Sequence, residues 1–291
     1  MSVAESTAAP AKVRTVALLT HTRPQDTAEA VGMAVAAAER DGCSLVGGPE
    51  ELDKHSAASL GDASALEGQP DLCLVLGGDG TMLAALRRYA GTGVPVFGVN
   101  FGTIGFLAAV DRDRLDEGLK LAFGGEFEVM GLPGLEAEIS TEYPVALNDI
   151  SFTRRPHGRV AELSYSIGGE EVGNVRCDGL VAATPAGSTG YNLANQGPIL
   201  AWGVEGYVVS FIAPHTLTAR ALVVAPGDAL TVRNAAGRDP VDVALDGEHV
   251  DELASGKELA VSFRDSASRL AQLPGASFYH RMREKFGRLA Q

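Results

Sequence analysis

The sequence predicts two domains, an α/β domain over residues 1–125 and an all-β, sandwich-like domain over residues 126–274. Before Gly125, short apolar runs alternate with helix-forming stretches, which is typical of parallel strands joined by helices. After Phe127, short β-branched runs follow one another between turns. The last stretch, residues 275–291, carries apolar residues at helical spacing and is expected to pack back on the first domain.

The first domain is predicted to be Rossmann-like, with its central strand at residues 72–76. This run has no polar interruption, as expected of a strand that is buried on both faces. Residues 1–12 are small and polar, and we expect a disordered lead-in there. In chain order, the predicted strands cover residues 13–19, 44–46, 72–76 and 96–99, and the predicted helices cover residues 24–40, 57–66, 82–89 and 113–123.

The second domain is predicted to be an all-β sandwich or barrel-like layer with one polar loop. Gly168 and Gly169 lie between two of the predicted strands and indicate a hairpin. A final helix is predicted over residues 277–289, where Phe278, Met282 and Phe286 form an apolar stripe. The predicted strands cover residues 145–153, 160–167, 171–175, 180–183, 207–212, 221–224, 229–232, 241–245 and 259–263.

Composition excludes several classes of protein. The formal net charge of -13 argues against nucleic acid as a partner, because phosphate backbones recruit clustered lysine and arginine. No apolar stretch approaches the roughly 20 residues that span a bilayer, so no membrane partner is expected. Cys43, Cys73 and Cys177 are widely spaced and form no metal-ligand pattern, and a reducing cytoplasm is the simplest inference.

A glycine-rich turn follows the central strand. Gly77, Gly78 and Gly80 separate the strand from a helix, an arrangement that gathers backbone N–H groups into a site for phosphate. Asp79 is the unusual member, because a carboxylate repels phosphate unless it holds a metal ion or accepts a proton from a hydroxyl. A plain Asp-Gly turn is the alternative, but such turns usually join two strands, and here a helix follows.

A second polar loop begins at Thr184. Its hydroxyls and free backbone amides suit a base edge and a ribose, and Tyr191 adds a stacking surface. Ser188 is a poor candidate nucleophile, because the Gly-x-Ser-x-Gly pattern is absent. Taken alone, the loop is equally compatible with ordinary turn chemistry.

Taken together, these stretches resemble the NAD kinase family, which is ATP- or polyphosphate-dependent. The resemblance rests on five blocks in one order: Gly-Gly-Asp-Gly-Thr from Gly77, Gly-Val-Asn-Phe-Gly-Thr-Ile-Gly-Phe-Leu from Gly98, Ala-Leu-Asn-Asp from Ala146, residues 178–194, and Pro-His-Thr-Leu-Thr-Ala-Arg from Pro214. The first block alone is shared with diacylglycerol-kinase-like and phosphofructokinase-like enzymes.

The resemblance implies roles for individual residues. Asp79 would face the 2′-hydroxyl of the adenosine ribose of NAD and accept its proton during phosphoryl transfer. Asn148 would suit an adenine edge, and Asp149, where the family has the longer Glu, would suit ribose hydroxyls or Mg²⁺. The full set of predicted substrate-binding residues is Gly78, Gly80, Thr81, Asn148, Asp149, Arg159, Arg176, Asp178, Thr189, Gly190, Tyr191, Asn192, Leu193, Ala194 and Asp246.

Structural roles without substrate contact remain open for part of this set. Arg159 and Arg176 are candidate phosphate contacts or surface salt-bridge partners, and Asp246 lies in a sequence typical of a hairpin turn. Asn148 and Asp149 are equally typical of a turn at a strand end. No side chain is predicted to be a metal ligand from its spacing.

The resulting expectation is a cytoplasmic enzyme that converts NAD to NADP with ATP or polyphosphate as donor and Mg²⁺ or Mn²⁺ as cofactor. The family resemblance also implies a homodimer or homotetramer. Two rival functions share part of the pattern: a diacylglycerol-kinase-like lipid kinase, and a dinucleotide-binding module without catalysis, which has no need of Asp79.

Overall fold

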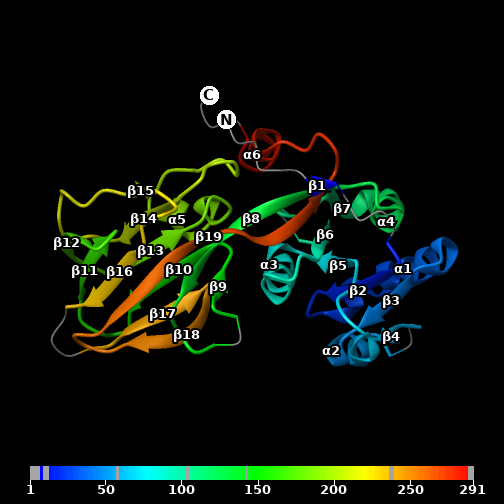
Figure 1. Ribbon diagram of the computed structural model, residues 1–291, viewed down its shortest axis with the longest axis horizontal. Coiled ribbons are helices and arrows are strands. Elements are labelled where there is room, and N and C mark those ends of the chain that lie inside the picture. The colour runs from blue at the N-terminus through cyan, green and yellow to red at the C-terminus, as the bar shows by residue number, and fades with distance from the viewer. Residues whose placement is uncertain are drawn as a thin grey trace. The chain divides into compact units, whose positions relative to one another are not determined.

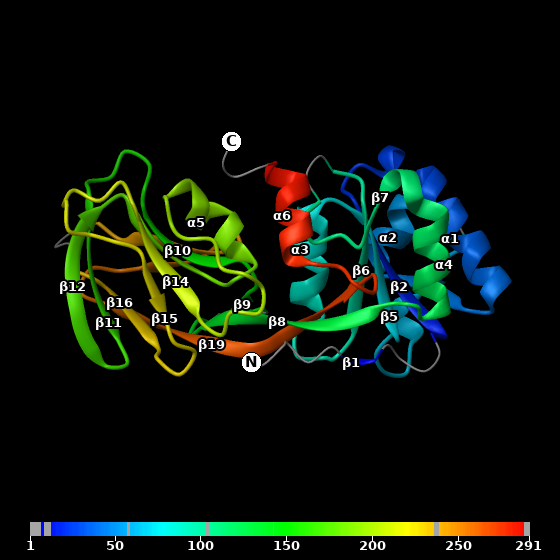
Figure 2. The same ribbon diagram turned by 90° about the horizontal axis from the view of Figure 1, so that it is seen from above.

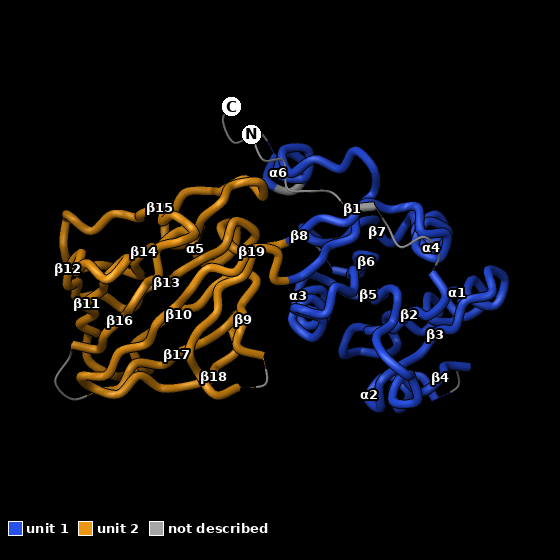
Figure 3. The backbone as a smooth tube through the Cα atoms, viewed as in Figure 1, with its two compact units in different colours: residues 1–131, 268–291 blue, residues 132–267 orange. Residues whose placement is uncertain are grey.

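The computed structural model describes residues 7–8, 13–56, 59–102, 105–141, 143–235 and 239–287. It divides into two compact units, Met1–Gly131 with Ser268–Gln291, and Leu132–Ala267, which Figure 3 shows in different colours. The first unit is an α/β domain and the second is a β-sandwich, as the sequence predicts. The domain boundaries predicted after residues 125 and 274 stay a prediction.

The sheet of the first unit is built from parallel strands in the order β19-β6-β5-β2-β3-β4 (Figure 1). β5 is central and completely buried, because every residue of its apolar run contacts a neighbour on one face or the other. The strands are β2 (Thr15–Thr20), β3 (Ser44–Gly47), β4 (Gly61–Asp62), β5 (Leu72–Gly77), β6 (Pro95–Asn100) and the end of β19 (Glu258–Gln272), with β7 (Val110–Asp111) beside β6.

Two helices, α1 (Ala28–Asp41) and α4 (Leu115–Gly124), lie side by side in the first unit (Figure 2). Their buried faces share one core cluster with Leu72, Leu74 and Leu76 of β5. Each helix ends at a glycine in the left-handed conformation, Gly42 and Gly125, where a residue without Cβ is unstrained. The remaining helical elements are η1 (Pro24–Asp26), α2 (Pro49–Lys54), η2 (Ala63–Ala65), α3 (Asp79–Arg88) and η3 (Arg112–Arg114).

The helix predicted at residues 57–66 is wrong in its described part. Residues 61–62 form β4 and residues 63–65 a single 3-10 turn, in which the Asp62 side chain accepts the N–H of Ser64. Residues 57 and 58 lie outside the described residues. The helix of this region is α2, with Pro49 at its first position and glutamates in its first turn. These are ordinary helix-start signals, which weak apolar periodicity obscured.

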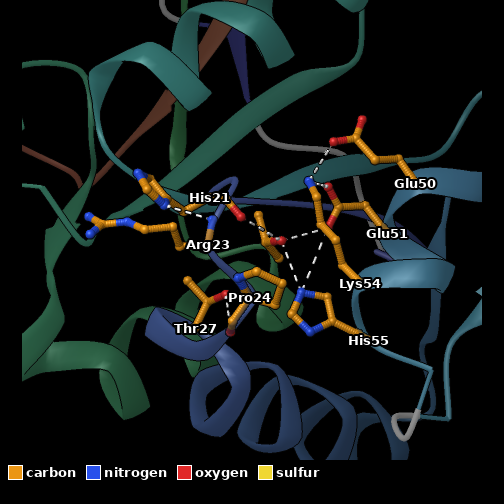
Figure 4. A network of polar contacts seen from close by, with 9 residues as sticks. His21, Arg23, Pro24, Thr27, Glu50, Glu51, Lys54 and His55 are labelled. Atoms are coloured by element: carbon orange, nitrogen blue, oxygen red, sulfur yellow. Dashed lines mark hydrogen bonds and ion pairs between the residues drawn. The ribbon is translucent and has the colours of Figure 1, made fainter.

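A buried polar network attaches α2 to the end of β2 (Figure 4). The hydroxyl of Thr20 donates to Glu51 Oε2 at 2.6 Å and lies 2.9 Å from Nε2 of His55. Lys54 donates to the other oxygen of Glu51 at 3.0 Å. Burial lowers the pKa of His55, so its neutral form is favoured inside this network.

The second unit contains two antiparallel sheets, β12-β11-β16-β19 and β15-β14-β13-β10-β17-β18. Their facing side chains, among them Phe152, Leu163, Tyr207 and Val232, form one core cluster, the usual interior of a sandwich. The strands are β10 (Asp149–Arg154), β11 (Ala161–Ile167), β12 (Glu170–Cys177), β13 (Gly179–Ala183), β14 (Tyr207–Ile212), β15 (Leu222–Val224), β16 (Leu230–Asn234), β17 (Val241–Leu245) and β18 (Glu248–Leu253), with β8 (Glu128–Ala137) and β9 (Val145–Ala146) paired beside them.

The strands of this unit differ from the prediction in three ways. The predicted strand at residues 145–153 is split into β9 and β10 by a turn at Leu147 and Asn148. β8 and β18 were not predicted, and β18 is a charged edge strand without apolar alternation. β19 continues from its predicted end at residue 263 to Gln272 through a charged segment.

The chain ends are described in part. Residues 7–8 form β1, which pairs with β8, so the predicted disordered lead-in is wrong for these two residues. The rest of residues 1–12 and residues 288–291 lie outside the described part of the chain. The last helix, α6, covers Phe278–Phe286. Among the described helices, none is long and apolar enough to cross a membrane.

Candidate functional site

The glycine turn between β5 and α3 places Asp79 at the first position of a helix. Gly77 lies so close to Thr81 that a Cβ at residue 77 would be 2.5 Å from its hydroxyl oxygen. Around Gly80, in contrast, nothing lies within 4 Å of the position of a Cβ, so the backbone is open to an approaching ligand. The turn therefore presents the N-terminus of α3, where anionic groups are favoured.

The Asp79 carboxylate is bound by the backbone of the segment that follows β6. Oδ2 accepts the N–H of Phe106 at 2.9 Å and Oδ1 accepts the N–H of Leu107 at 3.0 Å. The same segment is anchored by Asn100, whose side chain accepts the N–H of Gly102 and donates to Asp111. Asp79 is thus held in one orientation beside the glycine turn; Thr103 and Ile104 of this segment lie outside the described residues.

In the second unit, three predicted stretches meet at one edge of a sheet. β10 begins at Asp149, between β13 and β17, and runs antiparallel to both. Asp149 is paired with Ala183, the last residue of β13, and Ile150 with Leu245, the last residue of β17. The Asn148 turn, the loop from Thr184 and the Asp246 turn therefore lie side by side.

Asp246 holds the Asn148 turn. Its carboxylate accepts the N–H groups of Leu147, Asn148 and Asp149 at 3.0, 2.6 and 3.1 Å. Its own N–H donates to the carbonyl of Asp149 at 2.9 Å, and its φ of 51° places it in the left-handed region. The predicted contact of Asp246 with substrate stays a prediction, while its observed partners are backbone groups of the neighbouring turn.

The loop after β13 is locked to the same turn. The Thr184 hydroxyl donates to the carbonyl of Leu147 at 2.6 Å and accepts the N–H of Gly187 at 3.0 Å, and the N–H of Thr184 donates to Asn148. At Gly187, a Cβ would lie 2.0 Å from the carbonyl oxygen of Asn148. Only glycine fits between the loop and the turn.

Residues 189–194 divide into a buried and an exposed set. Asn192 is fully buried, and its Nδ2 donates to the carbonyls of Ser188 and Pro198, so its side chain holds the loop together. Thr189 is half-buried and donates to Ala186. Leu193 is half-buried, and Gly190, Tyr191 and Ala194 are exposed, at the start and within α5 (Tyr191–Ala194). The contact surface of this loop is therefore centred on Tyr191, which is 41% exposed.

The buried Ser188 hydroxyl is part of the same scaffold. It donates to the carbonyl of Pro185 at 2.7 Å and accepts the N–H of Leu200 at 2.9 Å. A hydroxyl with these two partners and no exposure serves the loop structure, which agrees with the weak case for a nucleophile.

Electrostatics distinguish Asp149 from the other acids of this edge. It is buried, and burial together with the nearby charge of Asp246 raises its pKa to about 7. Burial also raises the pKa of Tyr191, with further contributions from the charges of Asp149 and Asp178. The Tyr191 ring therefore lies close enough to both carboxylates to sense their charge.

The three remaining predicted residues, Arg159, Arg176 and Asp178, line one open cavity of about 990 Å³ within the second unit. Asp178 pairs with Arg154 at 2.6 Å, and this hydrogen bond lowers the pKa of its carboxyl group. Arg154 was not predicted, because only the pairing of β10 with β13 shows that it lies beside Asp178. Guanidinium groups and His215 line the cavity together with the acids Glu162, Asp178 and Asp239. It therefore offers donors for phosphate oxygens and acceptors for hydroxyl groups.

The contrast between Gly187 and Gly190 gives a testable prediction. Replacing Gly187 by Ala drives a methyl group into the Asn148 backbone, and we expect a loss of about 2–3 kcal/mol in the free energy of unfolding. At Gly190 the nearest atom to a Cβ is the Gly187 oxygen at 3.3 Å, so Gly190→Ala is the matched control with a small effect. Urea unfolding of both variants measures the difference, and equal midpoints would contradict the packing argument.

Comparisons with known proteins bear on the family and the fold of the chain. Residues 27–127 match the model of the ATP-NAD kinase N-terminal domain, and residues 147–273 match that of the ATP-NAD kinase C-terminal domain. Among solved structures, the yeast NADH kinase complexed with NADH has a TM-score of 0.83 at 20% identity, covering 96% of this chain and 89% of that one. An NAD kinase from Archaeoglobus fulgidus in complex with ATP has a TM-score of 0.69 at 24% identity, covering 94% and 97%. These two likenesses show the fold.

Curated relatives are more similar in sequence. The NAD kinase of Symbiobacterium thermophilum is 37% identical over 246 residues, which is 80% of this chain and 87% of the relative. The NAD kinase of Gemmatimonas aurantiaca is 34% identical over 225 residues, which is 75% of this chain and 77% of the relative. With both domain models matched in order, the chain belongs to the NAD kinase family.

Proposed function

We propose that this enzyme, a phosphotransferase of the NAD kinase family, phosphorylates the 2′-hydroxyl of the adenosine ribose of NAD and thereby forms NADP. The observation that carries the proposal is the Asp79 carboxylate, fixed by two N–H groups beside a glycine turn at the start of α3. A turn that only binds phosphate would be weakened by that negative charge, whereas a turn that catalyses phosphoryl transfer needs a group to orient the hydroxyl.

Asp79 would orient the hydroxyl and take its proton. Each carboxylate oxygen has two acceptor positions, and each accepts one N–H in the structure, so capacity for a hydroxyl donor remains. A carboxylate is a weak base for an alcohol, but in a loose phosphoryl-transfer transition state the proton leaves late. Orientation of the oxygen is therefore its main contribution. Gly78, Gly80 and Thr81 would line the phosphate side of the turn.

The second unit would bind the dinucleotide. The Asn148 amide suits an adenine edge, the Asp149 carboxylate suits ribose hydroxyls, and the exposed ring of Tyr191 offers a face for stacking. The neighbouring Thr189, Gly190 and Ala194 would surround the base. Asn192 and Leu193 would support them from within the loop, as Asp246 supports the turn. Arg159, Arg176 and Asp178 would meet the polar remainder of NAD in the cavity they share.

A divalent cation, Mg²⁺ or Mn²⁺, would neutralise the phosphates of the donor. Asp149 fits such an ion, because a cation would offset the cost of its buried charge, and the other ligands would be phosphate oxygens. Among the described residues, Asp242, His249 and Glu252 are also close enough to share an ion. Both of their carboxylates already pair with Arg155, so we do not assign the cofactor to them.

Three further features belong to the proposal. We place the enzyme in a reducing cytoplasm, where the buried thiols of Cys73 and Cys177 stay reduced. We expect a homodimer or homotetramer, for which the exposed Leu222 and Val223 on the edge strand β15 offer apolar surface. We also propose that the last helix returns to the α/β domain, a placement supported by the packing of Phe278 against Phe106.

The role of Asp79 is tested with Asp79→Asn. We expect NADP formation to fall by about 10²–10⁴-fold in kcat, because the group that orients the hydroxyl and takes its proton is lost while NAD binding elsewhere is retained. Asp71→Asn is the matched control, since Asp71 also accepts two backbone N–H groups, those of Arg14 and Thr15, at the other end of β5. The assay couples NADP to a dehydrogenase, with NAD, ATP and Mg²⁺ supplied.

Each rival function gives a different result in the same assay. A lipid kinase would phosphorylate diacylglycerol and leave NAD unchanged, and a binding module would retain NAD without forming NADP. An active Asp79→Asn enzyme would show that the assigned role of Asp79 is wrong. Replacing ATP by polyphosphate, and NAD by NADH, then identifies the donor and the preferred dinucleotide.

Asp149 predicts an unusual dependence of stability on pH. Its pKa in the folded protein, about 7, is above its ordinary value, so the folded state holds the proton more tightly than the unfolded state. Its contribution to stability is present at low pH and is lost as the pH rises to about 7. Relative to wild type, Asp149→Asn should gain on the order of 2 kcal/mol in the free energy of unfolding between about pH 5 and about pH 8.5.

Comparing the two proteins at each pH removes the contribution of other groups. His55 acts in the opposite sense, because burial lowers its pKa and the folded state loses stability as the pH falls below its ordinary value. That effect is common to wild type and Asp149→Asn and cancels in the difference. Parallel pH curves for the two proteins would contradict the assignment of a buried, titrating Asp149.

A further inference from the structure

Arg281 on α6 is buried, although its side chain carries a charge. It is 8% exposed, and its Nη1 donates to the carbonyls of Phe106 and Ala108. Burial lowers its pKa, and among the charges that oppose this effect Asp79 is the largest, ahead of Glu284 and Asp111. The guanidinium group therefore lies in the electrostatic neighbourhood of Asp79.

The two carbonyls that bind Arg281 belong to the segment that binds Asp79. In residues 106–108, the N–H groups of Phe106 and Leu107 point to the Asp79 carboxylate, and the carbonyls of Phe106 and Ala108 point to Arg281. A short stretch of backbone is thus held between an anion and a cation. Neither hydrogen-bonded set can move without disturbing the other.

Aromatic contacts fix α6 on the same residue. The ring of Phe278 packs edge-on against the ring of Phe106, with centroids 5.9 Å apart, and the ring of Phe286 lies 6.0 Å from it. The side chain and the carbonyl of Phe106 are therefore both contacted by α6. These contacts fix the position of α6, and therefore the position from which Arg281 binds the two carbonyls.

Residues 106–108 need such a restraint because two glycines lie just before them. Gly102 and Gly105 precede Phe106, and Gly105 has a φ of 61°, where few other residues are unstrained. A glycine-rich backbone loses much entropy when it is ordered. Two charged side chains on opposite sides offset that loss.

We propose that Arg281 is a positioning residue for the phosphoryl transfer, which holds residues 106–108 so that their N–H groups orient the carboxylate of Asp79. The inference rests on the proposed function of Asp79. It makes the last helix part of the catalytic apparatus: without the guanidinium group, two buried carbonyls lose their donor, the backbone turns, and Asp79 loses its two N–H partners. Arg281 itself has no contact with substrate in this role.

The first test measures kcat and KM for NAD in Arg281→Met. We expect kcat to fall roughly 10–100-fold, because a small misplacement of a reacting group has an effect of that size, while KM changes by less than about threefold. Arg283→Met is the matched control on the same helix. Arg283 is exposed, with its Nη2 3.1 Å from Nδ1 of His280, and its replacement should leave full activity. Arg281→Lys, which keeps donors for the carbonyls, should recover part of kcat.

The second test repeats the substitution in an Asp79→Asn background. If Arg281 acts through Asp79, Arg281→Met should lower the residual single-turnover rate of the Asp79→Asn enzyme by less than about threefold. The carboxylate that Arg281 positions is already absent from that enzyme. Equal losses in both backgrounds would overturn the proposal, and so would a normal kcat for Arg281→Met. Thermal unfolding of each variant gives its folded fraction, and the rates are corrected for that fraction. If Arg281→Met does not fold, Arg281→Lys is used in its place in both backgrounds. A wild-type enzyme that forms no NADP would instead refute the proposed function.

Discussion

Hydrogen bonds from loop N–H groups to an aspartate carboxylate hold both parts of the candidate site. Asp79 binds the amides of Phe106 and Leu107, and Asp246 binds those of the turn from Leu147 to Asp149. Charge-assisted bonds of this kind are about twice as strong as neutral ones. Because each aspartate is remote in sequence from the loop it binds, the loops take their shape only when the whole sheet behind them has formed. Local propensity would leave both loops undefined.

These aspartates also concentrate negative charge where an anionic substrate is expected. The chain has a formal net charge of -13, and Asp149 lies buried beside Asp246 with a raised pKa. The structure offsets this charge locally, with glycine N–H groups at the start of α3 and with the guanidinium groups of Arg154, Arg159 and Arg176 around one cavity. Placement of a few donors, and not the overall charge, thus decides which ligands bind.

Sequence patterns were sufficient for elements whose burial follows their own periodicity. The apolar run of β5 and the alternating strands of the sandwich needed no knowledge of their partners. Sequence patterns were insufficient where contacts with residues distant in the sequence determine the structure. β18 is charged and forms only because β17 is beside it, Asn192 is buried by its own loop, and Asp246 faces backbone groups 97 to 99 residues away. Arg281 was missed for the same reason: among the basic residues of α6, only tertiary contacts distinguish it.

The burial of Arg281 is itself an argument about function. Removing a guanidinium group from water is expensive, and here hydrogen bonds to two buried carbonyls offset part of that cost. The two carbonyls it binds follow directly after Gly105, which allows the backbone more conformations than another residue would. The guanidinium group therefore satisfies two carbonyls and at the same time fixes the direction of the amides at Asp79. The buried guanidinium group of Arg281 thus fixes the position of the Asp79 carboxylate.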